Sequence, residues 1–182
     1  MKYKSICIDP GHGMSNKRSG VFDPGACFGK LEEAKIVMDW ANELRAILQS
    51  RGHRVIRTRI NNSEPCPIGV RSEVASEYKC DIMISLHCNA ATGGATGTEV
   101  IYRGDTNRAF AALISKTVSN ALGLRDRGAK VEADSQHKRL AVMSYQPCFL
   151  IEIGFIDNLK DAESLIDPQK RLDACIAIAE LL

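Results

Sequence analysis

The sequence predicts an α/β fold, because short apolar runs alternate along the chain with longer segments of helical periodicity. Three of the runs have the composition of strands that are buried on both faces of a sheet, and they cover residues 4–9, 81–86 and 148–151. Two further strands are expected at residues 53–57 and 98–102. A length of 182 residues suits one hydrophobic core, so we expect residues 1–182 to form a single domain.

Four segments have the periodicity of amphipathic helices. The first covers residues 31–50, and its apolar residues form one stripe that ends before Gly52. The last begins after Asp167, which we expect to be the N-cap, with Pro168 at the first helical position. The other two helices are expected around residues 70–78 and 109–122.

Two polar segments lack such periodicity. Residues 125–136 carry six charged side chains, and we expect an irregular surface loop beside the functional site. Residues 92–97 are rich in glycine but lack the lysine of a phosphate-binding loop and precede a strand, so we expect a flexible connection there.

Composition excludes several classes of partner. The 24 Lys and Arg against 22 Asp and Glu give a net charge of +2 without a basic run, and aromatic residues are scarce, so no nucleic-acid partner is expected. No apolar run approaches the length that spans a membrane, and the N-terminus lacks a signal-peptide core. We therefore expect a monomer without membrane insertion, synthesised in the cytoplasm without a signal peptide.

The cysteines also bear on the compartment. Their number is odd, at seven, and no two of them form a CxxC pair. We expect buried thiols of a reduced compartment and not a framework of disulfides.

Ionisable residues follow three of the predicted strands. His12 follows the first, His87 follows the strand at residues 81–86, and Glu152 ends the run at residues 148–151. In open α/β sheets ligands bind outside the carboxyl ends of the strands, so we expect these three side chains to meet at one edge of the sheet.

A fourth candidate comes from helical geometry. Glu33 lies on the same helical stripe as Val37, Trp40 and Leu44, so its carboxylate is expected to point inward, whereas Glu32 lies about a quarter turn away. A buried carboxylate needs a partner, and two histidines with one carboxylate form a catalytic zinc set that leaves one tetrahedral position open. Glu33 is favoured over Glu32 as the third ligand, and Glu32 stays open as the alternative.

Glu152 is not needed for this metal set. Zinc lowers the pKa of water in its open position to about 7, and a nearby glutamate can accept the proton and deliver it to a departing amine. The alternative is that Glu152 pairs with Arg71. Among the other candidates, His53 is interpreted as structural and Cys88 as buried, whereas His137 could contact a substrate.

Several motifs resemble one known family. IDPGHG, DPGA, Glu33, SLHCNA and FLIEIGFIDN occur in the order and at the spacing of the N-acetylmuramoyl-L-alanine amidases called Amidase_3, and the similarity covers residues 6–166. By this resemblance His12, Glu33 and His87 match the ligands of one zinc ion, and Glu152 matches the catalytic glutamate. The resemblance also implies a three-layer fold with a mostly parallel, twisted sheet of about six strands and helices on both faces.

The function implied by the resemblance is zinc-dependent hydrolysis of the amide bond between N-acetylmuramic acid and L-alanine in bacterial peptidoglycan, for lysis or remodelling of the cell wall. The protein would act at the wall after release, as an endolysin does, or as part of a longer secreted protein. The alternatives are a peptidoglycan-binding module without catalytic activity and another zinc amidohydrolase or peptidase.

Overall fold

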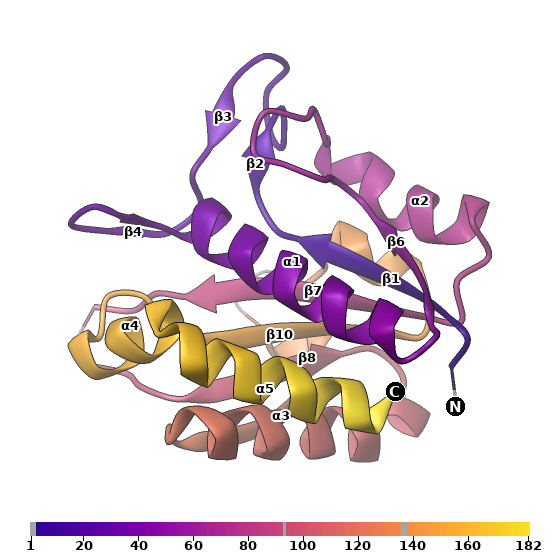
Figure 1. The fold of residues 1–182 in the computed structure, drawn as a ribbon. Helices are drawn as coiled ribbons and strands as arrows, with labels where there is room; N and C mark the ends of the chain where they lie inside the picture. Colours follow the sequence, from indigo (N-terminus) through magenta and orange to yellow (C-terminus); the bar gives the residue numbers. More distant parts are fainter. Residues whose placement is uncertain (1–2, 93, 136–137) are drawn as a thin grey trace.

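A six-stranded mixed sheet forms the centre of the computed structural model, which describes residues 3–92, 94–135 and 138–182 (Figure 1). Across the sheet the strands are ordered β6 (Arg54–Arg57), β1 (Ser5–Pro10), β7 (Ile82–Asn89), β10 (Cys148–Phe155), β8 (Thr98–Tyr102) and β9 (Asp126–Val131). The first four are mutually parallel, β8 is antiparallel to β10, and β9 is parallel to β8. The α/β class and the mostly parallel sheet are confirmed.

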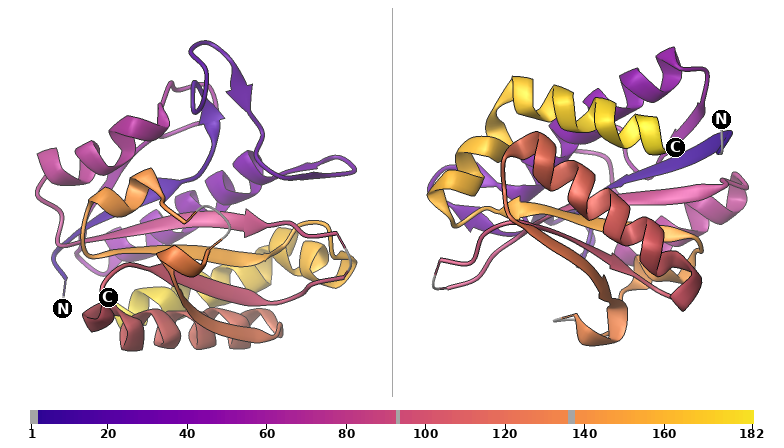
Figure 2. Two further views of the ribbon diagram at one scale, coloured as in Figure 1. Left: turned by 180° about the vertical axis from the view of Figure 1, so that it is seen from behind. Right: turned by 90° about the horizontal axis from the view of Figure 1, so that it is seen from below.

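Helices cover both faces of this sheet. One face carries α1 (Glu33–Ser50), α3 (Arg108–Leu122) and α5 (Pro168–Leu181), which lie in front of the strands in Figure 1. The larger core lies between these helices and the strands, and it contains the fully buried Trp40, whose indole N–H donates to the carbonyl of Leu165 over 3.0 Å. The other face carries α2 (Arg71–Glu77) and the 3₁₀ turn η4 (Ala141–Ser144), seen from behind in Figure 2.

The start of α1 differs from the expectation by two residues. Leu31–Glu32 form β5, which pairs with β4 (Cys27–Phe28) in a short hairpin, and a second hairpin joins β2 (Gly13–Met14) to β3 (Phe22–Asp23). Hydrogen bonds from the Glu33 and Ala34 N–H groups to the chain at Ala26 and Pro24 occupy the first donors of the helix. The hairpin therefore fixes where α1 begins, without a side-chain cap.

The expectation of an irregular loop at residues 125–136 is wrong. Asp126–Val131 form β9, the strand at the edge of the sheet, and Glu132–Asp134 form the 3₁₀ turn η3; Gln136 lies outside the described residues. The strand is held by backbone pairing with β8 and carries charged side chains, as edge strands often do. Because the composition of β9 is polar, no apolar run in the sequence predicted this strand.

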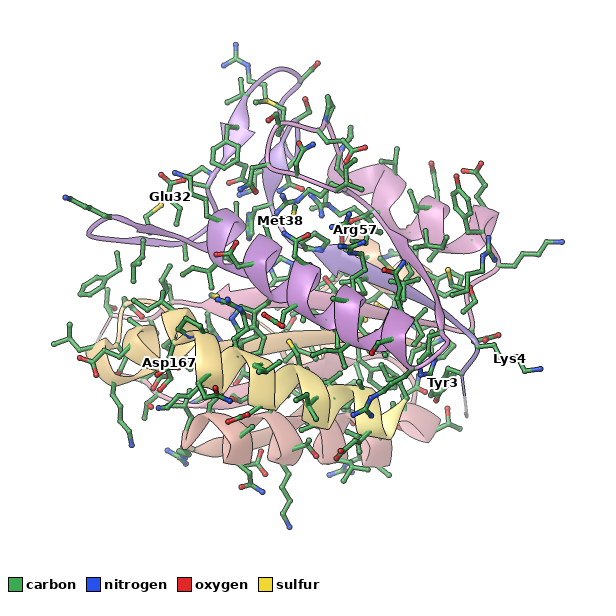
Figure 3. The ribbon with its side chains drawn as sticks, in the orientation of Figure 1. Tyr3, Lys4, Glu32, Met38, Arg57 and Asp167 are labelled. Carbon is green, nitrogen blue, oxygen red and sulfur yellow. The ribbon has the colours of Figure 1, made fainter. Side chains whose placement is uncertain are left out.

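The C-terminal helix begins as expected. The Asp167 side chain accepts hydrogen bonds from the N–H groups of Gln169 and Lys170, and Pro168 occupies the first turn of α5. Asp167 lies where α5 follows α4 (Leu159–Ile166), a short helix that the periodicity did not reveal (Figure 3). The remaining 3₁₀ turns are η1 (Ile68–Val70) and η2 (Asp105–Asn107).

The state of the cysteines agrees with the expectation of free thiols, with one exception in their burial. All seven cysteines are free, and six of them are buried; Cys27, in the β4 hairpin, is exposed, which corrects the expectation for that residue. Within the described residues, no helix combines the length and the apolar character that crossing a membrane requires.

A buried carboxylate on α4 ties together the connections at one end of the sheet. Asp161 is fully buried and accepts hydrogen bonds from the Thr96 hydroxyl at 2.5 Å, the Gly97 N–H at 2.8 Å and the Phe155 N–H at 2.9 Å. The end of the connection expected to be flexible is thereby anchored, whereas its Gly93 lies outside the described residues.

Replacement of Asp161 by alanine should therefore destabilise the fold. Two backbone N–H groups would lose their acceptor in a buried environment, and we expect the free energy of unfolding to fall by about 2–4 kcal/mol. Denaturant unfolding measures this change. The control is Asp173→Ala, on the exposed side of α5, which should change the stability by less than about 0.5 kcal/mol; equal stabilities of the two variants would contradict the role of Asp161.

Candidate metal centre and its neighbouring carboxylate

The parallel strands β1, β7 and β10 bring the predicted site residues to one edge of the sheet. His12 lies just beyond β1, while Glu152 and His87 are directly paired in the register of β10 and β7. Both strands continue further than expected, so His87 and Glu152 are strand residues and not the first residues after the strands. The pairing places Glu152 next to His87 without any contribution from a loop.

Glu33 joins the two histidines. His12 Nε2 lies 3.0 Å from Glu33 Oε2, His87 Nδ1 lies 2.9 Å from Glu33 Oε1, and one potential ligand atom from each residue falls within 4.8 Å of the others. Ligands of a tetrahedral metal bound at ~2.1 Å would be separated by about 3.4 Å, so small shifts suffice to admit an ion. The cluster could therefore hold a metal.

The alternative ligand Glu32 is not part of this cluster. Its carboxylate pairs with Lys35 over 3.0 Å, and Figure 3 shows Glu32 where the β4–β5 hairpin leads into α1. Glu33 is only 3% exposed and also accepts the N–H groups of Ala26 and Cys88. The helical-stripe argument thus selected the inward carboxylate of the two.

Asp23, in β3, orients His12 and was not singled out from the sequence. Its Oδ2 lies 3.0 Å from His12 Nδ1 and also accepts a hydrogen bond of 2.7 Å from the Asn16 amide. A carboxylate on one ring nitrogen directs the other nitrogen towards a metal and raises its basicity. The DPGA motif was the available signal, since Asp23 is its first residue.

Two glycines leave the space that the cluster occupies. A Cβ atom at Gly11 would lie 2.2 Å from the His87 ring, and one at Gly25 would lie 2.5 Å from Glu33 Oε2. Gly25 also has a φ of +71°, which L side chains rarely adopt. These close approaches explain why the two Pro-Gly turns of the motifs contain glycine.

Two buried arginines hold the loop that carries His12, whose φ is +58°. Arg59 donates to the carbonyls of Pro10 and Gly11 over 2.9 and 2.7 Å, and Arg71 donates to those of Pro10 and His12 over 2.9 and 2.6 Å. Arg71 also pairs with Asp9 over 2.7 Å, so it is Asp9 and not Glu152 that neutralises Arg71. The two arginines thus fix the carbonyls of Pro10, Gly11 and His12 and with them the left-handed backbone at His12.

The charges of the cluster reinforce one another. Burial disfavours the charged form of His12, but the Glu33 and Asp23 carboxylates outweigh it and raise its pKa. Burial would likewise raise the pKa of Glu33, but hydrogen bonds and charges from His12 and His87 hold that pKa far below its usual range. Glu33 is therefore an anion, as a metal ligand must be.

Glu152 lacks such partners. Its Oε2 is buried and has no hydrogen-bond partner among the described residues. Burial, followed by the negative charges of Glu33 and Glu99, raises the pKa of Glu152 well above that of an ordinary glutamate. Glu152 lines the same cavity as His12, Glu33 and His87. Such perturbed carboxyl groups in clefts are frequent at catalytic sites.

Neither His53 nor the Cys88 thiol is one of the potential metal ligands. His53 is buried, with Nδ1 2.8 Å from the Tyr3 carbonyl oxygen. The Cys88 thiol is buried, and its pKa is raised well above the usual value by burial and then by Glu33 and Glu152. His137 lies outside the described residues.

Two histidines and a glutamate that could hold one metal ion, beside a carboxyl group of raised pKa in an α/β domain, form an arrangement typical of hydrolases. The family model described as N-acetylmuramoyl-L-alanine amidase, Amidase_3, matches residues 6–182. The chain therefore belongs to this amidase family.

Relatives and solved structures agree with this assignment. A cell wall amidase of Bacillus anthracis, itself uncharacterized, is 31% identical over 194 residues, which cover 96% of this chain but 34% of the relative. The sporulation-specific N-acetylmuramoyl-L-alanine amidase of Bacillus subtilis is 33% identical over 165 residues, or 88% of this chain and 59% of the relative. Both relatives are thus considerably longer than the matched region.

The catalytic domain of the amidase CwlV from Bacillus (Paenibacillus) polymyxa has the same fold. The two structures superpose with a TM-score of 0.84 at 27% sequence identity, over 98% of this chain and 95% of that domain. The observed sheet and helices are therefore those of an amidase catalytic domain.

Replacement of Asp9 by asparagine should expose the contribution of the buried ion pair. Although burial acts to raise it, Arg71 and then the Thr58 and Ser85 hydroxyls hold the pKa of Asp9 below its ordinary value. Loss of the charge leaves Arg71 buried without its anion, and we expect the free energy of unfolding at pH 7 to fall by about 3–5 kcal/mol.

The pH dependence of this deficit follows from the sign of the shift. A lowered pKa stabilises the fold above the unfolded value of about 3.9, and the stabilisation is lost as the pH falls through the folded value. The difference between wild type and Asp9→Asn should shrink in that acid window, as denaturant unfolding at several pH values would reveal. Asp105→Asn, an exposed control, should change the free energy of unfolding at pH 7 by less than about 0.5 kcal/mol.

Replacement of Gly25 by alanine should impair metal binding. The added methyl group would collide with Glu33 and His12, and we expect the affinity for a divalent transition metal to fall by about 10–100-fold. Competition with a chromophoric chelator measures that affinity.

Gly29→Ala provides the matched control. Gly29 also has a positive φ, of +59°, but a Cβ there would meet nothing within 4 Å. Its replacement imposes comparable backbone strain without reaching the cluster, so its metal affinity should stay near that of the wild type. Equal losses in both variants would show that strain, and not the cluster, determines the affinity.

Proposed function

We propose that this domain hydrolyses the amide bond between N-acetylmuramic acid and L-alanine in bacterial peptidoglycan, with one zinc ion held by His12, Glu33 and His87 and with Glu152 as the catalytic carboxyl group. The observation that carries the proposal is that Glu152, whose buried Oε2 has no hydrogen-bond partner among the described residues, lines the same cavity as the three potential ligands. Membership of the amidase family supports the choice of substrate.

The ligand set suits zinc. Two imidazoles and one carboxylate leave a fourth tetrahedral position open, as in catalytic zinc sites, and the space beside the cluster is kept by Gly11 and Gly25. When bound, zinc supplies a Lewis acid that polarises a carbonyl oxygen and lowers the pKa of water. Asp23 holds His12 in the orientation that presents Nε2 to the ion.

Glu152 moves the proton. A carboxyl group with a raised pKa is a stronger base than an ordinary glutamate, so it can accept a proton and later donate that proton to the leaving nitrogen. Removal of a proton from the attacking water and its transfer to the L-alanine nitrogen balance the hydrolysis. Because Glu152 lies on a central strand, paired with His87, its distance from the ligands is set by the sheet.

The proposed setting is the bacterial cell wall, where the monomeric domain would take part in lysis or remodelling. The relatives named cell wall amidase and sporulation-specific amidase support this setting. An endolysin-like role and a role within a longer secreted protein both fit the proposed activity.

Mass spectrometry of digested peptidoglycan tests the proposal. We expect the protein to release peptides with a new L-alanine amino terminus, to lose this activity after chelation and to regain it with zinc. Glu152→Gln should reduce the rate by about 10²–10⁴-fold while it still binds zinc, because only the proton transfer is removed.

Glu163→Gln, an exposed change on α4, is the control and should cleave as the wild type does. Zinc-loaded protein that binds peptidoglycan but releases nothing would indicate a binding module without catalytic activity. Products cut at another bond would indicate a zinc peptidase or a different amidohydrolase.

A further inference from the structure

Two cavities meet at the proposed catalytic centre. The polar cavity, of about 240 Å³, contains the three potential metal ligands together with Asn89, Glu99 and Ser135. The apolar cavity, of about 320 Å³, lies between η1, η4 and the sheet. Both are lined by His12, Lys17, His87, Ile101 and Glu152. If the scissile bond of a substrate lies over these shared residues, the two parts of the substrate on either side of that bond therefore lie in different cavities.

The apolar cavity has a wall suited to a small hydrocarbon group. Ile101 and Leu150 are paired across β8 and β10 and form its inner side, where both are almost fully buried. Val142 from η4 is also buried, whereas Ile68 from η1 lies at the mouth with 47% of its surface exposed. Such a wall favours the methyl group of alanine over a sugar hydroxyl.

Among the cationic side chains that line the apolar cavity, Arg139 is the one that is not paired with a carboxylate in the described residues. Asp9 and Arg71 lie at its base, but they pair with each other over 2.7 Å. Lys17 lies 3.3 Å from Asp23. Arg139 is exposed, lines the same cavity and forms no ion pair among the described residues. Its guanidinium is thus the cation that can receive an anionic group from a ligand in the cavity.

The chain beside Arg139 is anchored. Glu132 accepts two hydrogen bonds from Arg103, of 2.6 and 2.8 Å, and a further one of 2.5 Å from the N–H of Leu140. Burial would raise the pKa of Glu132, but these hydrogen bonds and the charges of Arg103 and then Arg139 lower it. The residue after Arg139 is therefore fixed to the body of the domain, which limits how far the guanidinium can move from the cavity.

We infer that the apolar cavity binds the peptide side of the scissile amide and that Arg139 selects a free carboxylate on the residue that follows L-alanine; the inference rests on the proposed function. The alanine methyl group lies against the apolar wall and the carboxylate meets the guanidinium. A carboxamide at the same position has no negative charge and one acceptor oxygen in place of two, so it cannot form the bidentate ion pair that a carboxylate forms with a guanidinium. Arg139 is thus a specificity-determining residue, and the glycan occupies the polar cavity.

Cleavage of two matched probes tests the inference. N-acetylmuramoyl-L-alanyl-γ-D-glutamyl-L-lysine has a free α-carboxylate on the residue after L-alanine, and N-acetylmuramoyl-L-alanyl-D-isoglutaminyl-L-lysine has a carboxamide in its place; in both, the γ-carboxyl group of that residue is in an amide bond with lysine. We expect the zinc-loaded wild type to favour the acid by about 10-fold in kcat/KM. Arg139→Ala should lose that preference, mainly through a fall in kcat/KM for the acid probe, and Arg108→Ala, an exposed change at the start of α3, should keep it.

Binding separates a failure of this inference from a failure of the proposed function. Calorimetry with the free peptides L-alanyl-γ-D-glutamyl-L-lysine and L-alanyl-D-isoglutaminyl-L-lysine should show the same preference and the same loss in Arg139→Ala. A preference in binding without cleavage of either probe would support the role of Arg139 and overturn the proposed hydrolysis. Cleavage of both probes without a preference, or a preference that survives in Arg139→Ala, would overturn the role of Arg139.

Discussion

The burial of the Glu33 carboxylate is the constraint on which the site and much of its surroundings depend. A charge that is 3% exposed needs compensating groups on every side, and here they are His12, His87 and the N–H groups of Ala26 and Cys88. Those partners come from three separate stretches of chain, and Glu33 itself lies on a fourth. The cluster therefore exists only when β1, β7, the β4 hairpin and α1 are assembled together, which couples metal binding to the fold.

The residues around the cluster are also paired with one another. Arg59 and Arg71 satisfy the carbonyls of the loop that carries His12, and Asp9 neutralises Arg71. Glu152 differs from Glu33 and Asp9, because its buried Oε2 has no hydrogen-bond partner among the described residues. The contrast gives the site one anion held charged and one carboxyl group whose pKa is raised, a separation of pKa values that is typical of acid-base catalysis.

Most of the sheet could be predicted because buried strands leave apolar runs in the sequence, and His12, His87 and Glu152 could be placed at its edge because parallel strands end together. The edge strand β9 could not, since its side chains are polar and its stability comes from backbone pairing with β8. Asp23 was missed for a related reason: its contact with His12 is made across a two-stranded hairpin with no apolar pattern.

The sequence by itself determined the α/β class, the order of the motifs and the inward direction of Glu33, because these depend on local periodicity and on the residues next to each strand. Only the tertiary structure decided that β10 lies between β7 and β8, that Glu152 is paired with His87, and that two cavities with different linings meet there. Strand order and cavity shape arise from contacts between segments far apart in the chain, and no local pattern of residues encodes such contacts.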